Sequence, residues 1–147
     1  MPAVAIPDID IVKDGGKVWT DWLVSAQVPE ALHEGYGNQR NSIKVRFDMK
    51  SEGGVNALNM EDKQAAVQLF DTIAEYGVFV VQKGELENWL EDLGVQGKKT
   101  DWTVAMLERL GSDPADSGYV QPAQGDVWDF MKAIVSWVRN PTRKGIA

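Results

Sequence analysis

The stretch that decides the predicted fold is residues 76–82, Tyr-Gly-Val-Phe-Val-Val-Gln. Its four consecutive apolar residues, 78–81, are typical of a strand that is covered on both faces. The residues just before it, 61–76, carry apolar side chains at helical spacing, and Gly77 fits the end of that helix. A helix that leads directly into a buried strand indicates a layered α/β fold.

A second apolar run, residues 3–6, predicts a short strand that ends at Pro7, because proline lacks the N–H that a ladder needs. We expect it to lie beside and parallel to the strand at 78–82, after a right-handed crossover. Residues 43–49 alternate between apolar and polar side chains, which predicts either an edge strand or a functional insertion.

The predicted fold class is therefore α/β, a small, mainly parallel, Rossmann-like sheet with packed helices and a helical C-terminal tail. The length of 147 residues fits one domain, 1–147, with an α/β part at 1–97 and a helical tail at 98–147. Helical spacing also predicts further helices, at 17–27, 85–93, 101–110 and 126–139. The six tryptophans lie on or near apolar stripes, which favours core packing over stacking on nucleic-acid bases.

Composition excludes several classes of site. Cysteine is absent and His33 is the only histidine, so thiolate metal sites and a multi-histidine zinc site cannot form in one chain. The net charge of −7 disfavours nonspecific binding to nucleic acid. No P-loop motif and no apolar run of about 20 residues is present. We expect a cytoplasmic protein without a membrane partner.

Two acidic motifs follow the predicted strands. The first is Asp8-Ile9-Asp10, and the second is Gly84-Glu85-Leu86-Glu87. Sites in open α/β sheets lie at the carboxyl ends of strands, so these carboxylates can share one cleft, where Mg²⁺ or Mn²⁺ would relieve their repulsion. The sequence thus predicts a metal site, although each motif also fits ordinary turn or helix-start chemistry. The neighbouring Lys83 is either a phosphate contact or a solvated side chain.

The order of these segments resembles the C-terminal Toprim region of OLD-type and AAA-type ATP-dependent endonucleases. The resemblance rests on the strand with Asp8-Ile9-Asp10, on 76–81 with 84–90, and on shorter likenesses at 93–95, 126–130 and 143–145. It implies a half-Toprim, Rossmann-like unit that binds divalent metal and cleaves DNA. By position it implies metal ligands at Asp8, Asp10, Glu85 and Glu87, with Lys83 and Glu85 in catalysis.

The resemblance begins at the Asp-x-Asp strand, without the family's first Toprim strand and its glutamate or the ATPase. We therefore expect a nuclease module that is a fragment or partner of a P-loop ATPase, weak or inactive alone and weak in binding DNA. Its expected protein partner is the ATPase or a second copy in a homodimer. The alternative from a different class is a non-catalytic protein–protein interaction domain.

Overall fold

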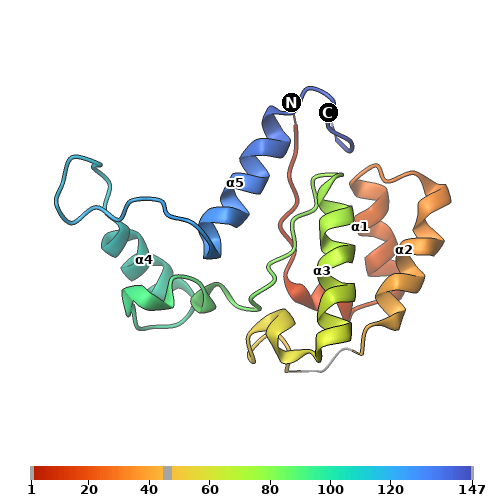
Figure 1. Cartoon of the computed structure of the whole chain (residues 1–147), viewed down its shortest axis with the longest axis horizontal. Helices are drawn as coiled ribbons and strands as arrows, with labels where there is room; N and C mark the ends of the chain where they lie inside the picture. The colour runs from red at the N-terminus through yellow and green to blue at the C-terminus, as the bar shows by residue number, and fades with distance from the viewer. Residues whose placement is uncertain (1, 45–47, 147) are drawn as a thin grey trace.

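In the computed structural model, which describes residues 2–44 and 48–146, the chain forms helices joined by long irregular segments (Figure 1). The α-helices are α1 (Gly16–Ser25), α2 (Glu30–Ser42), α3 (Met60–Ala74), α4 (Lys99–Leu110) and α5 (Asp126–Arg139). The same residues include four short 3₁₀ helices. One, η1 (Ile9–Val12), comes before α1, and three lie between later α-helices: η2 (Gly54–Ala57), η3 (Leu86–Asn88) and η4 (Glu91–Leu93).

The predicted α/β fold class is wrong. Within residues 2–44 and 48–146 there is no β-strand, so the mainly parallel, Rossmann-like sheet is not present. The two runs expected to be strands do lie side by side and parallel, but only through two isolated bridges, Ala5–Val78 and Asp8–Val81. Of the third expected strand, 43–49, residues 45–47 lie outside the described part, and residues 48–50 form a turn.

The pairing between the two runs is short for local reasons. The amides of Phe79 and Val81 donate to the carbonyls of Ala5 and Pro7, at 2.8 and 3.0 Å. Pro7 has no amide to donate in return, and the chain turns into η1 directly after Asp8. The apolar residues of 78–81 are nevertheless all buried, because helices rather than neighbouring strands cover them. Burial on both faces was the correct inference, but it did not require a sheet.

Helices α1, α2 and α3 lie side by side and form the main core with the extended runs (Figure 1). Helix α3 begins at Asn59, whose side chain accepts a hydrogen bond from the Asp62 amide at 2.9 Å. Its apolar stripe is fully buried, as the sequence predicted: Ala66, Leu69, Phe70 and Ile73.

Helix α5 packs on the other side of the 78–81 run. Phe79, Ile134 and Trp137 make a second, smaller core there. Gly77 permits this packing, because its φ is +81° and a Cβ at this position would lie 2.7 Å from the Trp137 ring. Glycine therefore ends α3 and also leaves the space into which the indole of α5 fits.

The segment from η3 to α4 forms an arm at the end of the molecule away from α1 to α3 (Figure 1). The helix predicted at 85–93 is instead two 3₁₀ turns, η3 and η4, because Leu90 adopts a left-handed φ of +55° between them. Four of the six tryptophans are buried, as expected: Trp19, Trp89, Trp102 and Trp137. In the described part of the chain, no helix is both long enough and apolar enough to span a bilayer.

Candidate functional site

The acidic motifs meet at one cleft of about 390 Å³, at the end of the paired runs. Asp8, Glu85 and Glu87 all line it, so the structure brings together three of the four predicted metal ligands. Asp10 is not part of this lining; it lies in η1, with its carboxylate 3.4 Å from the Lys13 ammonium. The other lining residues are Ile6, Lys50, Val81, Gly84, Leu86 and Lys99.

Two of the three carboxylates in the cleft, Asp8 and Glu87, are bonded to groups of this same chain. Asp8 Oδ2 pairs with the Lys50 ammonium, and this hydrogen bond raises the pKa of Lys50. Glu87 Oε1 accepts the Lys99 amide at 2.6 Å, which lowers the pKa of Glu87. Asp8 Oδ1 is buried and has no hydrogen-bond partner among the described residues.

This arrangement does not fit the predicted Mg²⁺ or Mn²⁺ site. A divalent ion of this kind needs several oxygen ligands that converge on one point. Across residues 2–44 and 48–146, no three Asp, Glu or His side chains lie close enough together to hold a metal ion. Lys50 places its own positive charge on Asp8, so the cleft neutralises that carboxylate without an added cation.

Lys83 and Glu85, the predicted catalytic pair, are on different sides of the segment that carries them. Glu85 lines the acidic cleft, whereas Lys83 lines a second pocket. Gly84 between them has a φ of +92°, and a Cβ there would lie 2.0 Å from the Lys50 carbonyl oxygen. Because the backbone is left-handed at Gly84, the side chains of Lys83 and Glu85 line separate pockets.

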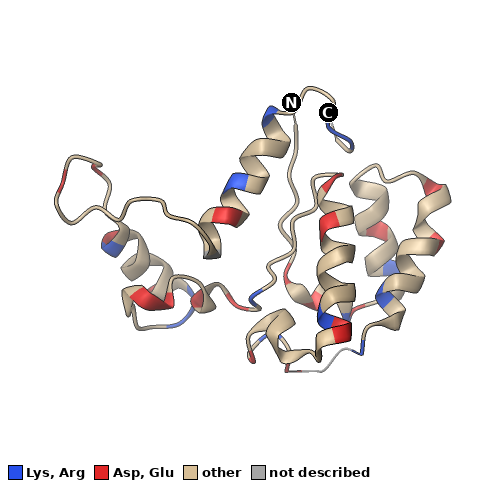
Figure 2. Ribbon diagram, viewed as in Figure 1, with Lys and Arg blue, Asp and Glu red and all other residues tan. Residues whose placement is uncertain are grey.

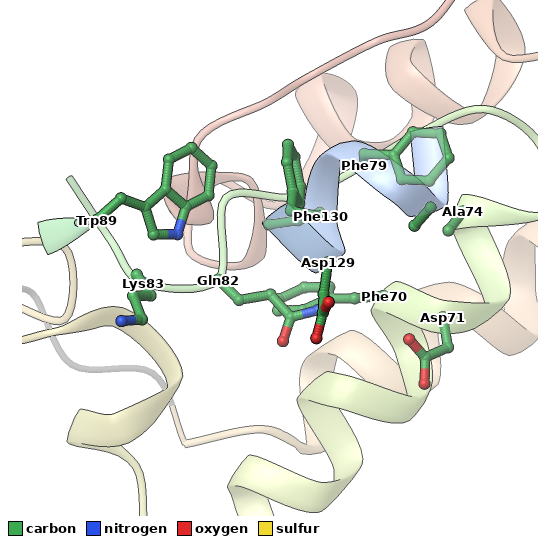
Figure 3. Close-up of a pocket in the computed structure, with 11 residues that line it drawn as sticks. Phe70, Asp71, Ala74, Phe79, Gln82, Lys83, Trp89, Asp129 and Phe130 are labelled. Carbon is green, nitrogen blue, oxygen red and sulfur yellow. The ribbon is translucent and has the colours of Figure 1, made fainter. Parts of the chain in front are cut away.

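The second pocket, with a volume of about 360 Å³, has mainly apolar walls that include four aromatic side chains (Figure 3). Phe70 of α3, Phe79, Trp89 and Phe130 of α5 come to it from separate parts of the chain. The Phe130 ring lies edge-on to Phe79, with centroids 6.2 Å apart, and its centroid is 5.0 Å from that of Trp89. We call this feature the aromatic pocket; its remaining lining residues are Asp71, Ala74, Val80, Gln82, Lys83, Asp129 and Ala133.

Polar groups stand at the edge of the aromatic pocket. The side chains of Asp71 and Asp129 are exposed, and those of Gln82 and Lys83 are half-buried. Asp129 also lies 3.6 Å from the Lys132 ammonium in an exposed pair, which is weak in water. None of the described residues that line the pocket is His, Ser, Thr or Tyr. The apolar walls and the exposed carboxylates of Asp71 and Asp129 suit an apolar group with a positive neighbour.

The sequence did not reveal the aromatic pocket. Helical spacing places Phe70 and Phe130 on the apolar stripes of their helices, and the sequence predicts core packing for Trp89. The only signal was the number of aromatic residues, because no sequence pattern shows that positions this far apart converge.

Comparison with known proteins gives no relative from which a function could be transferred. No family model matches the chain, and neither a curated protein nor a solved structure matches it.

Proposed function

We propose that this chain is a non-catalytic protein-interaction module whose aromatic pocket receives one apolar side chain of a partner protein. The observation that carries this proposal is the pocket itself: apolar, partly aromatic walls that open to solvent. Anchor side chains in such pockets supply most of the binding energy at many protein interfaces. Burying one of them contributes about 1.5–3 kcal/mol.

The charge at the edge of the pocket indicates what lies beside the anchor. Asp71 and Asp129 are both exposed carboxylates there, and the whole chain carries a net charge of −7. A basic residue next to the apolar anchor would meet these carboxylates, and the overall field would speed the approach of a basic segment. The partner is therefore a protein segment with an apolar anchor and a neighbouring Lys or Arg.

A random peptide library displayed on phage tests this function without a known partner. Selection on the full chain is expected to enrich peptides with a large apolar residue next to a basic one. Ala133 lines the pocket from α5 and is exposed, so Ala133→Phe fills the pocket from its open side. Selected peptides should lose at least tenfold in affinity for Ala133→Phe and keep their affinity for the matched control, Ala133→Ser.

Two results would contradict the proposal: no enriched motif after repeated selection, or peptides that bind wild type and Ala133→Phe equally. Each variant is first compared with wild type by circular dichroism and thermal melting, so that loss of binding is not loss of fold.

The metal-dependent DNA endonuclease that the resemblance implies stays a prediction. Its support is the gathering of Asp8, Glu85 and Glu87 around one cleft and the unpaired Oδ1 of Asp8. The geometry favours it less, because Lys50 pairs with Asp8 and Lys83 lies in the other pocket. Incubation with supercoiled plasmid and Mg²⁺ or Mn²⁺ separates the two functions. Cleavage that disappears in Asp10→Ala would overturn the non-catalytic proposal.

A further inference from the structure

Helix α5 has an apolar surface that its own chain leaves uncovered. One stripe of the helix, Phe130, Ile134 and Trp137, packs against the rest of the protein. A second stripe points elsewhere: Met131, Val135 and Val138 are exposed by 47, 41 and 37%, and the half-buried Trp128 continues their line. We call Trp128, Met131, Val135 and Val138 the α5 outer stripe.

The spacing along the α5 outer stripe is three, four and three residues. This alternation keeps the side chains in line on one helix face and is the spacing of helices that pack against a partner helix. A basic residue follows two members of the stripe: Lys132 comes after Met131, and Arg139 comes after Val138. Both are exposed and lie seven residues apart on one flank of the stripe. Within the chain, Lys132 donates to the Ala123 carbonyl at 2.8 Å and lies 3.6 Å from Asp129, exposed contacts that a partner carboxylate would have to replace.

Helix α4 has an exposed apolar stripe whose one flank is acidic. Its inner face buries Trp102 and Met106, whereas Val104 and Leu107 are exposed by 51 and 64%. With Thr100 before them, these two residues repeat the four-three spacing; we call the three the α4 outer stripe. The acidic residues Asp101 and Glu108 follow it at the corresponding positions, also seven residues apart and exposed.

The two outer stripes are complementary in one direction only. When α4 and α5 pack antiparallel, the equivalent flanks of the stripes face each other, which sets Asp101 opposite Arg139 and Glu108 opposite Lys132. In a parallel pair, the basic flank of α5 would face the other flank of α4, where Thr103 lies. The acidic flank of α4 would face the other flank of α5, where Ile134 lies, so neither charge would meet an opposite charge. Both helices carry charges of both signs (Figure 2); Asp129 on α5 and Arg109 on α4 lie off these flanks.

We propose that the occupant of the α5 outer stripe is α4 of a second copy of this chain. Within one molecule, α4 lies in the arm beyond the long loop from 111 to 125 (Figure 1), and its outer stripe remains exposed. Two copies related by a two-fold axis make the α4–α5 contact twice, which closes the assembly as a dimer. The inference is independent of the aromatic pocket, which lies on another face of α5.

Net charge makes the local ion pairs decisive. Two copies that each carry −7 repel one another, so association depends on the places where opposite charges meet. Reversing one flank alone should therefore abolish the dimer. Reversing the two flanks in different chains should allow those chains to pair with each other but not with themselves.

The experiment uses two charge-reversed chains and sedimentation velocity. Chain one carries Lys132→Glu with Arg139→Glu, and chain two carries Asp101→Lys with Glu108→Lys. Wild type is expected to sediment at twice the chain mass of 16.3 kDa. Each variant alone is expected at the single mass, because both of its α4–α5 contacts then join like charges. An equimolar mixture should return to the double mass, because both contacts in the mixed dimer join opposite charges.

Apolar variants with a matched control complete the test. Val135→Ser on α5 and Leu107→Ser on α4 should each weaken the dimer at least tenfold. Val18→Ser, at an α1 residue that is exposed by 46%, should leave it unchanged. A wild type that stays monomeric at the highest attainable concentration would overturn the proposal. A dimer that ignores the charge reversals, or a series of larger assemblies, would overturn it too. The peptide selection on the aromatic pocket is unaffected by either result.

Discussion

Trp137 on α5 donates its indole N–H to the backbone carbonyl of Glu75, one residue beyond the end of α3, with Nε1 and the oxygen 2.9 Å apart. The two residues are far apart in sequence, and this bond holds the C-terminal helix against the body of the protein. Lys144 adds an exposed ion pair with the Glu75 carboxylate, at 2.5 Å, on the same end of the helix.

Trp137→Phe removes the indole donor but keeps an aromatic ring. We expect it to lower the free energy of unfolding by about 1–3 kcal/mol, from the lost hydrogen bond and the smaller buried ring. Urea denaturation followed by circular dichroism measures the loss. Trp22→Phe, at a half-buried tryptophan of α1, is the matched control and should cost less. Equal losses in the free energy of unfolding at the two positions would show that the hydrogen bond to Glu75 makes no specific contribution to stability.

Gly77→Ala tests the close approach between the end of α3 and α5. The φ of +81° disfavours any side chain, and the added methyl group would meet the Trp137 ring at 2.7 Å. We expect a loss of about 2–4 kcal/mol, the sum of left-handed backbone strain and overpacking. Gly118→Ala is the control, because nothing lies within 4 Å of its Cβ position and its φ is not positive. That change should alter stability by less than about 0.5 kcal/mol.

Glu87 should make stability depend on pH on the acid side. Its pKa lies below the usual 4.5 in the folded chain, because its carboxylate accepts the Lys99 amide. A carboxyl group with a lowered folded pKa stabilises the fold above its unfolded pKa, and this contribution disappears as pH falls through the folded pKa. Glu87→Gln should therefore melt lower than wild type at pH 7 and show a smaller difference at pH 3. A constant difference across this range would contradict the prediction.

Mg²⁺ should leave the melting temperature unchanged. An ion that binds only the folded state raises stability by mass action, but Asp8 is already paired with Lys50 and no three carboxylates converge in the described chain. Thermal melts with MgCl₂ are compared with melts in NaCl at equal ionic strength. A rise specific to Mg²⁺ that vanishes in Asp8→Asn with Asp10→Asn would instead support the metal site predicted from the sequence.

The sequence predicted most of the α-helices but little of the structure of the segments between them. The spacing of Ala66, Leu69, Phe70 and Ile73 correctly predicted the buried face of α3, because a helix repeats on a length that one segment contains. The run 78–81 correctly predicted burial, but an apolar run does not say whether strands or helices cover it. The helix expected at 85–93 failed at Leu90, whose left-handed backbone no propensity indicated.

One of the two candidate sites could be predicted in part from the sequence, and the other could not. The acidic cleft could be predicted in part, because the pairing of 3–8 with 78–81 brings Asp8 near Glu85 and Glu87. The ion-pair partner of Asp8 could not be predicted from the sequence, since Lys50 comes from a turn whose position depends on packing. The aromatic pocket depends on contacts between residues 70–89 and the distant helix α5, which no local pattern of a single sequence encodes.

The two-bridge pairing at the N-terminus has a consequence for hydrogen exchange. Because Phe79 and Val81 donate their amides to the carbonyls of Ala5 and Pro7, release of one short N-terminal segment would expose both amides together. Their deuterium uptake should therefore proceed at one common rate, set by the opening of residues 3–8. The Val78 amide, which donates to Ile73 within the same stretch of chain, should exchange independently of that opening.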